Sequence, residues 1–238
     1  MSATLPIHEM FMTFQGEGVH MGKPAFFLRT FGCPVKCPWC DSAGTWHPDY
    51  IPKDIMRATT AQLLNQIMTS RGAAQIVVIT GGEPAIHDLT ELTQKLNAAN
   101  FATHLETSGA FPIKGDFNWI TLSPKRWKTP LAENVTKAHE FKIIVGEMAA
   151  QDIDYYLHLL IQLGLRGISS GRRPIWLHPE WSQHKNPYVL KAIGEAVKHS
   201  RVDDLRAGWQ LHKLYAVDAQ DPRSRPIVPL GGNPLFGF

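Results

Sequence analysis

All three cysteines of this 238-residue chain lie within one stretch of eight residues, Cys33 to Cys40, at the spacing C-x3-C-x2-C. The gaps between them are too short for a disulfide framework, and an odd number of cysteines cannot all pair. Three thiolates this close together are typical ligands of a soft metal centre. The chain must therefore fold so that this loop, with Cys37 between the other two, faces a metal site.

Two kinds of metal site fit this spacing. Iron–sulfur clusters are normally held by four cysteines, so three cysteines would leave one iron of a 4Fe–4S cluster free to bind another molecule. The alternative is a zinc-binding structural module, because zinc takes four ligands, or three and a water, and His47 could supply the fourth. A colourless protein would indicate zinc, and a brown, oxygen-sensitive protein would indicate the cluster.

Composition narrows the class of protein. Hydrophobic residues make up 44% of the chain, which is enough for a buried core. The net charge of +3 argues against a nucleic-acid partner held by bulk charge. We find no apolar run of the roughly 18–20 residues that a membrane span needs, and residues 1–10 lack the order of a signal peptide. We therefore expect a cytoplasmic protein without a membrane partner, in a compartment where thiols stay reduced.

Strand-like runs alternate with amphipathic helical segments along the chain. Strand patterns occupy residues 7–14, 24–30, 75–80, 102–106, 119–122, 141–145, 174–177 and 205–211. Helical patterns run from about residue 60 to 70, 88 to 100, 152 to 163 and 186 to 199, whereas residues 41–57 and the tail 219–238 read as irregular. This alternation predicts an α/β fold of parallel units that curl into a barrel or part of one.

Polar and glycine-rich motifs follow the expected strands. They come directly after Thr30, Thr80, Glu106, Leu122 and Leu177. Ligands of parallel α/β sheets bind at the carboxyl ends of the strands. The sequence therefore predicts one active-site face that collects all of these motifs.

Three of these features have two interpretations each when taken alone. The loop at residues 15–18, QGEG, is either a hairpin turn or a ligand clamp, because its glycines permit close backbone approach. Arg29 interrupts an apolar strand, so it belongs either to a buried ion pair or to a site for a substrate carboxylate. The turn GGEP at residues 81–84 exposes backbone groups to a ligand, but it would also serve as a plain strand-to-helix turn.

Together, the cysteine spacing, the aromatic residue before Cys40 and the GGE motif resemble the radical S-adenosylmethionine (SAM) superfamily. The finer pattern resembles the 7-carboxy-7-deazaguanine synthase family over about residues 7–213. The matching segments are EMF-x2-FQGEG (9–18), G-x-PA-x-F-x-R (22–29), GCP-x2-C-x-WCD (32–41), VVITGGEP (77–84), ETSG (106–109), SPK (123–125) and QLHK (210–213).

This resemblance implies a partial (β/α)6 barrel of the radical SAM type in one domain, residues 1–238. It implies a carbon–nitrogen lyase that converts 6-carboxy-5,6,7,8-tetrahydropterin to 7-carboxy-7-deazaguanine with release of ammonia, in 7-deazapurine (queuosine) biosynthesis. A 5′-deoxyadenosyl radical formed from SAM would abstract the substrate C6 hydrogen, and SAM would be regenerated. The resemblance also implies magnesium, an electron donor such as flavodoxin, and a homodimer.

The resemblance assigns roles to individual residues. The 4Fe–4S cluster would be held by Cys33, Cys37 and Cys40, and magnesium by Ser42, where the family usually has threonine. The residues expected to contact SAM are Trp39, Cys40, Asp41, Gly82, Glu106, Ser123, Pro124, Lys125 and His178. The residues expected to contact the substrate are Phe14, Gln15, Gly16, Glu17, Arg29 and Thr80, with Arg29 on its carboxylate.

The chain also departs from the family pattern. Many relatives have a Gln-Pro-x-Ser stretch near SAM where this chain has the residues HPEW at 178–181. The tail is longer than in many relatives, and Phe238 is a further candidate for contact with the substrate. The alternative function is an activating enzyme for a glycyl-radical protein, which shares the cysteine triplet but acts on a protein loop and has no use for a pterin-clamping QGEG loop and Arg29.

Overall fold

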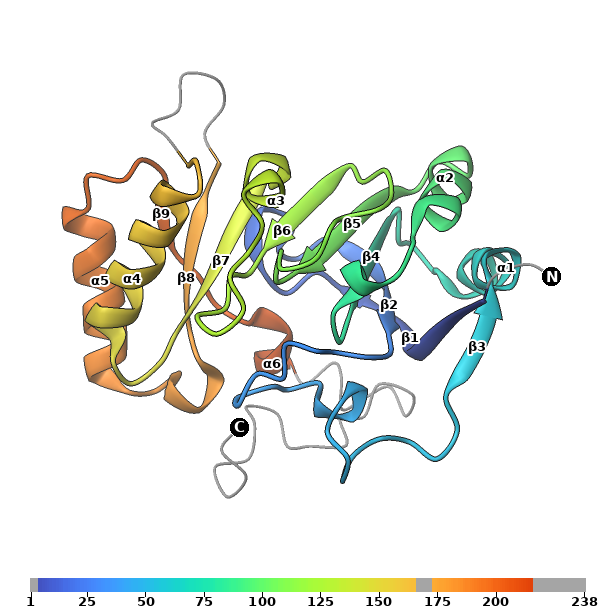
Figure 1. The fold of residues 1–238 in the computed structure, drawn as a ribbon, viewed down its shortest axis with the longest axis horizontal. Coiled ribbons are helices and arrows are strands. Elements are labelled where there is room, and N and C mark those ends of the chain that lie inside the picture. Colours follow the sequence, from blue (N-terminus) through green and yellow to red (C-terminus); the bar gives the residue numbers. More distant parts are fainter. Residues whose placement is uncertain (1–3, 166–172, 216–238) are drawn as a thin grey trace.

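The computed structural model describes residues 4–165 and 173–215. In these residues one nine-stranded sheet runs through the molecule in the order β3-β1-β2-β4-β5-β6-β7-β8-β9 (Figure 1). The strands are β1 (Thr4–Phe14), β2 (Pro24–Thr30), β3 (Met56–Thr59), β4 (Ile76–Gly81), β5 (Ala102–Thr107), β6 (Trp119–Leu122), β7 (Glu140–Val145), β8 (Ile175–Pro179) and β9 (Leu205–Ala207). The helices are α1 (Thr60–Ser70), α2 (Thr90–Ala98), α3 (Ala132–Lys137), α4 (Ala149–Gln162), α5 (Pro187–His199) and α6 (Leu211–Tyr215). Short 3₁₀ helices are η1 (Gly18–His20), η2 (Ala43–Thr45), η3 (Pro84–Ile86) and η4 (Trp181–Gln183).

The sheet is parallel from β2 onward. β2 pairs in parallel with β4, and each strand from β4 to β9 pairs in parallel with the next. β1 is antiparallel to both β2 and β3, so β1 and β3 extend one edge of the sheet. The described strands do not close into a ring. The fold is therefore an open, partial α/β barrel, which confirms the predicted fold class.

The two faces of the central strands carry different side chains. On β2, Phe26 and Leu28 are fully buried in an apolar cluster that α1 and α2 complete. Because side chains alternate along a strand, Phe27 and Arg29 lie on the opposite face, where both line a cavity. A second apolar cluster joins β7 and β8 to α4 and α5, which lie side by side at one end of the molecule (Figure 1). The helices thus cover the outer face and leave the inner face for ligands.

The predicted starts of two helices are confirmed. α1 begins after Thr59, whose hydroxyl accepts a hydrogen bond from the Gln62 amide at 3.3 Å. The Gln62 side chain in turn accepts from the Thr59 amide at 2.8 Å, which completes a capping box. α5 begins after Asn186, whose side chain accepts from the Tyr188 amide at 3.0 Å, with Pro187 in the first turn.

One prediction in the amino-terminal half is wrong. Residues 56 and 57, at the end of the segment 41–57 that is expected to be irregular, begin the edge strand β3, which pairs with β1. Both residues are exposed, so the strand carries no alternating apolar pattern that a sequence could reveal. In α1, Met68 is 49% exposed and does not belong to the buried face that Leu63 and Ile67 form.

The last predicted strand, residues 205–211, is also too long. β9 ends at Ala207, and the chain then turns inward so that the Leu211 amide donates to the Gly16 carbonyl at 2.9 Å and α6 begins. The predicted tail 219–238, with Phe238, lies outside the described residues. Within the described residues, no helix is both long enough and apolar enough to cross a membrane.

The contribution of the α1 capping box to stability can be tested by substitution. Thr59→Ala removes the hydroxyl that satisfies the Gln62 amide, so we expect the free energy of unfolding to fall by about 1 kcal/mol. Thr69→Ala is the matched control, because the Thr69 hydroxyl only bonds to carbonyls of its own helix. Urea unfolding of both variants should show a clear loss for the first and less than about 0.5 kcal/mol for the second. Equal losses would contradict the capping role.

Candidate active site

One large cavity opens at the carboxyl ends of the parallel strands. The volume of the cavity is about 220 Å³. All of the predicted site residues line the cavity except Gly16, Pro124 and His178. Most of the predicted site residues therefore meet in this cavity.

The register of the sheet places four of these residues in a row. Arg29 of β2 pairs with Thr80 of β4, and Glu106 of β5 pairs with Thr121 of β6. The pairing of Ile79 with Leu105 puts Thr80 next to Glu106. Neighbouring strands lie about 4.8 Å apart, so Arg29 and Glu106 stand about 10 Å from each other across the sheet. The row has a cationic side chain at one end and an anionic one further along.

The cysteine loop lies over the end of β2 and is tied down at three points. The Gly32 amide donates to the Thr45 carbonyl at 3.0 Å, and the Glu83 amide donates to the Gly32 carbonyl at 2.9 Å. The Trp127 indole donates to the Val35 carbonyl at 2.7 Å. These bonds hold the loop in place without help from a ligand.

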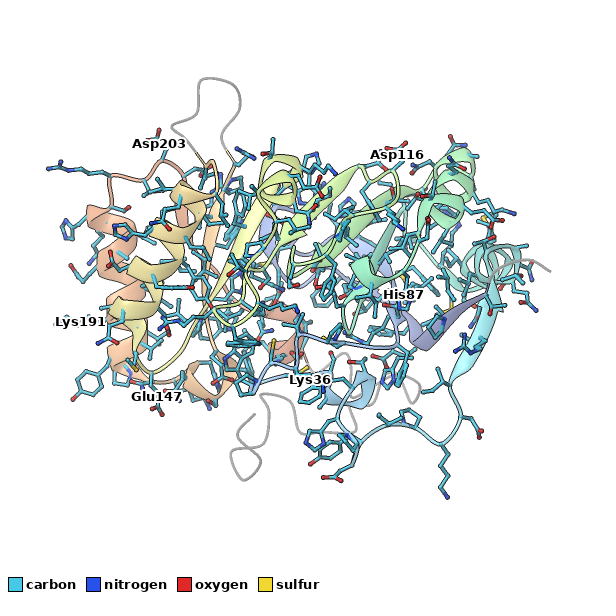
Figure 2. All side chains as sticks on the ribbon, viewed as in Figure 1. Lys36, His87, Asp116, Glu147, Lys191 and Asp203 are labelled. Carbon is cyan, nitrogen blue, oxygen red and sulfur yellow. The ribbon has the colours of Figure 1, made fainter. Side chains whose placement is uncertain are left out.

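The three thiols face one space. All three cysteines are free, and all three line the cavity. Lys36, between the first two, adopts a left-handed backbone with φ of 53° and is exposed (Figure 2). Burial raises the pKa of Cys37 to about 11 and that of Cys40 to about 12. A thiol must lose its proton to bind a metal, and burial makes that loss costly. A strongly positive metal centre would offset the cost, so these buried thiols fit such a centre.

No group of three or more His, Cys, Asp or Glu side chains in the described part of the chain is arranged to hold a single metal ion.

The turn after β4 packs directly on the cysteine loop. A Cβ atom on Gly82 would stand 2.1 Å from the Gly32 carbonyl oxygen, so only glycine fits there. Glu83, 1% exposed, accepts hydrogen bonds from the Thr107 hydroxyl at 2.6 Å and from the Ser108 amide at 2.9 Å. The glutamate of this turn is therefore a fixed part of the scaffold that links β4, β5 and the cysteine loop.

Side chains of opposite charge flank the cysteine loop on its inner side. Lys213 of α6 forms an ion pair with Asp41 at 3.0 Å, which brings the last described helix beside the cysteine loop (Figure 1). Lys125 donates to the Ser123 hydroxyl and to the Ser123 carbonyl at 2.7 Å each, and its ammonium lies 5.4 Å from the centre of the Trp39 ring. Ser123 and Lys125 of the segment SPK thus add a hydroxyl and a cation, bonded to each other, to the wall of the cavity.

The QGEG loop is anchored by a buried carboxylate below it. Gly18 has a φ of 68°, and a Cβ there would stand 2.4 Å from a carboxylate oxygen of Glu140. That carboxylate accepts from the Val19 amide at 2.9 Å and from the indoles of Trp119 at 3.0 Å and Trp176 at 2.9 Å. Charge-assisted hydrogen bonds of this kind are about twice as strong as neutral ones. These hydrogen bonds therefore hold the QGEG loop in one position.

Glu17, which is part of the QGEG loop, belongs to a buried network at the bottom of the cavity. Its carboxylate forms an ion pair with Lys142 of β7 and accepts from the Gln210 amide at 2.9 Å. Lys142 also lies 3.7 Å from Glu106, and the Gln15 amide donates to the other oxygen of Glu106 at 2.9 Å. Burial alone would raise the pKa of Glu17, but Lys142, with smaller effects of two histidines, lowers it to about 2.

Arg29 forms the ion pair that was one of its two interpretations. Its guanidinium donates to the Glu9 carboxylate at 2.6 Å and to the Gly81 carbonyl at 3.1 Å. The same side chain is 18% exposed and lines the cavity. Contact of Arg29 with a substrate carboxylate stays a prediction.

Three predicted contacts do not reach this cavity. His178 is fully buried behind the wall, and its ring lies against Gly208, so direct contact with SAM is not supported. Glu180 and Trp181, two and three residues later, line the cavity instead. Gly16 packs under His212 of α6, where a Cβ would stand 2.1 Å from the ring nitrogen. Pro124 is buried and does not line the cavity, unlike its neighbours in SPK.

The structure adds cavity residues for which the sequence analysis gave no role. Lys142, Gln210, His212 and Lys213 all line the cavity. The last three belong to the segment QLHK, which matched the family pattern but suggested no chemistry. Lys142 interrupts the apolar strand EFKIIV in the same way that Arg29 interrupts β2, and that signal could have identified it.

Comparisons with known proteins agree with this geometry. A family model described as a 4Fe-4S single cluster domain matches residues 14–112, which include the cysteine loop. The 7-carboxy-7-deazaguanine synthase of Synechocystis is 42% identical over 218 residues, covering 91% of this chain and 95% of the relative. The protein of the same name from Flavobacterium psychrophilum is 44% identical over 192 residues, covering 79% and 84%. The crystal structure of QueE from Escherichia coli superimposes with a TM-score of 0.72 at 35% identity, covering 88% of this chain and 95% of that one.

The contact between Gly82 and the cysteine loop can be tested without measuring catalysis. Gly82→Ala places a methyl group against the Gly32 carbonyl, so the loop must shift and cluster loading should fall at least several-fold. Gly194→Ala, in α5 with open space around it, is the control and should load normally. Iron and sulfide per protein after anaerobic reconstitution give the answer. Full loading of the Gly82→Ala variant would contradict the packing described here.

Proposed function

This chain belongs to the 7-carboxy-7-deazaguanine synthase family, and on that premise we propose that it converts 6-carboxy-5,6,7,8-tetrahydropterin to 7-carboxy-7-deazaguanine with release of ammonia. The relatives carry that name over nearly the whole chain. The reaction is a carbon–nitrogen lyase reaction, and its product would enter 7-deazapurine (queuosine) biosynthesis.

The observation that carries this proposal is the row of side chains from Arg29 to Glu106. A tetrahydropterin acid has a carboxylate at one end and an aminopyrimidinone with N–H donors at the other. Arg29 suits the carboxylate, and the carboxylates of Glu106 and Glu17 suit the N–H donors. The resemblance assigns Glu106 to SAM, but we assign it to the pterin because Lys142 and Gln15 hold it in the network of Glu17. Thr80, between them, can hydrogen-bond to the middle of the ligand, while Phe14 and Gln15 form its side wall.

The opposite side of the cavity suits the cluster and SAM. Cys33, Cys37 and Cys40 would hold a 4Fe–4S cluster, and the family model supports this assignment. We assign SAM to the space between Trp39, Asp41 and Gly82 on one side and Ser123 and Lys125 on the other. When bound, the cluster and SAM supply the deoxyadenosyl radical that takes the substrate C6 hydrogen. The chain's own residues orient the two ligands and exclude water.

Magnesium, the electron donor and the dimer also belong to the proposal. Ser42 lines the cavity, and its hydroxyl lies 3.4 Å from Asp41, so oxygen ligands of the kind magnesium prefers are at hand. A cluster of this type needs a one-electron donor such as flavodoxin, and we expect the protein to be a homodimer. The three free cysteines favour a reducing compartment such as the cytoplasm. The alternative of a glycyl-radical activating enzyme is not favoured, because the relatives are synthases.

The proposed reaction is tested by an anaerobic assay of the reconstituted protein with SAM, reductant, magnesium and 6-carboxytetrahydropterin. We expect mass spectrometry to find 7-carboxy-7-deazaguanine in many-fold excess over enzyme, with SAM not consumed in proportion. Slow release of 5′-deoxyadenosine and methionine without the deazapurine would show that the protein cleaves SAM, but it would exclude the pterin as the substrate.

Arg29 should affect substrate binding above all. Arg29→Gln removes the charge that faces the substrate carboxylate, so KM should rise about 10- to 100-fold, which corresponds to about 1.5–3 kcal/mol. Because this change also leaves Glu9 without its ion pair, Glu9→Gln is measured alongside and should change KM much less. Equal effects of the two variants would assign Arg29 to the scaffold alone.

Ser42 should set the magnesium requirement. Ser42→Ala removes the hydroxyl, so the magnesium concentration for half-maximal activity should rise about 10-fold or more. Ser42→Thr keeps the oxygen and should retain the wild-type requirement. A magnesium dependence that is unchanged in Ser42→Ala would remove this residue from the metal site.

A further inference from the structure

Lys142 lies at the centre of the buried network that Glu17 and Glu106 form, and the proposed reaction assigns it no contact with a ligand. Its ammonium pairs with Glu17 and lies 3.7 Å from Glu106, and its side chain is only 14% exposed. The residue sits on β7, whereas the two glutamates come from the QGEG loop and from β5. One cation therefore joins two acidic residues that are distant in sequence, at the end of the cavity away from Arg29.

Each of these glutamates also accepts one hydrogen bond from a glutamine. Gln210 donates to one oxygen of Glu17 at 2.9 Å, and Gln15 donates to one oxygen of Glu106 at 2.9 Å. Both glutamates still line the cavity. The network as a whole carries two carboxylates and one ammonium, so its formal charge is one negative. A ligand that meets it must supply N–H donors rather than acceptors.

We propose that Lys142 is a positioning residue for substrate recognition, which keeps Glu17 a carboxylate and holds it beside Glu106 as an acceptor site for an amidine-like N–H edge. This inference rests on the proposed function, because that edge is the aminopyrimidinone end of the tetrahydropterin acid. Together with Arg29 at the other end, the network fixes which way the substrate lies. Lys142 acts through Glu17 and Glu106 and need not touch the substrate.

The electrostatics of the network agree with this role. Burial would raise the pKa of Glu17, and only the charge of Lys142, with lesser help from His178 and His212, brings it down to about 2. Burial would likewise lower the pKa of Lys142, but Glu17, Glu106 and Asp41 raise it above its ordinary value. The charged groups around the network are thus Glu17, Glu106, Glu140, Asp41, Lys125 and Lys142, with the titratable His212 beside them. The neighbouring His178, whose pKa is lowered to about 4 by burial, stays neutral at pH 7.

The loss of Lys142 should reverse the pH dependence that Glu17 gives to stability. In the wild type the folded pKa of Glu17 lies below its unfolded value of 4.5, so its contribution is constant from pH 5 to pH 8 and is lost only at lower pH. In Lys142→Met the carboxyl is buried without a cation, so its folded pKa rises above the unfolded value and its contribution is lost as the pH rises. His178 shifts in the same direction when the lysine charge is removed.

The experiment is anaerobic urea unfolding of the cluster-loaded protein at pH 5, 6, 7 and 8. We expect the gap in unfolding midpoint between wild type and Lys142→Met to be largest at pH 8 and to shrink steadily toward pH 5. The control is Lys191→Met, the same substitution at an exposed lysine on α5 (Figure 2), which should show a small gap that does not vary with pH. A gap for Lys142→Met that stays constant from pH 5 to pH 8 would overturn the proposal.

Substrate binding supplies the second readout. At pH 8, Lys142→Met should bind 6-carboxytetrahydropterin at least 10-fold more weakly by calorimetry, while its affinity for SAM stays within about threefold, since the SAM side of the cavity is unchanged. If wild type binds no pterin, the proposed function fails, and the pH-dependent gap still tests whether Lys142 keeps Glu17 a carboxylate. If Lys142→Met does not fold at all, Lys142→Met/Glu17→Gln removes the buried acid together with its cation and should fold. A double variant that binds the pterin as tightly as wild type would overturn the proposal.

Discussion

The parallel register of β2, β4, β5 and β6 is the constraint on which the site depends. It places Arg29, Thr80, Glu106 and Thr121 side by side on one face, although they are far apart in sequence. The spacing of neighbouring strands then fixes the distances between their side chains. A slip of one residue in any strand would turn its member of the row to the helix-covered face. The apolar residues that alternate with the row, such as Leu28 and Ile79, are fully buried and so hold the register.

The loops that follow β1, β4 and β5 help to complete the cavity around this row, and two buried carboxylates hold them in place. Glu83 joins the turn after β4 to the start of the loop after β5, and Glu140 holds the QGEG loop through two indoles and a backbone amide. Such groups are costly to bury unless they are fully hydrogen-bonded, which they are here. The chain thus combines a cationic site for an acid, an anionic site for N–H donors and three thiols in one space. That combination suits a substrate with opposite polarity at its two ends, next to a metal cluster.

Much of this arrangement could be predicted from local sequence, and the rest depends on contacts between distant residues. The strand at 24–30 and the capping box at Thr59 follow from patterns within a few residues. The pairing of Glu17 with Lys142 spans 125 residues, and no sequence pattern near either residue predicts it. His178 occupies a motif position expected to touch SAM, but its side chain is buried between Gly208 and the network of Glu17 and Lys142, outside the main cavity. The inward turn after β9 brings Lys213 to Asp41. The sequence does not predict this turn, because the short strand and the residues that follow it have the pattern of one longer strand.

The central claim is that one pterin acid lies along the row, with its carboxylate on Arg29 and its aminopyrimidinone toward Glu106 and Glu17. An anaerobic crystal structure of the cluster-loaded protein with SAM and 6-carboxytetrahydropterin tests it most directly. The account predicts the substrate carboxylate within hydrogen-bond distance of the Arg29 guanidinium, and the N–H edge within hydrogen-bond distance of a glutamate oxygen of the Lys142 network. A substrate bound in the opposite direction, or outside the row, would contradict it.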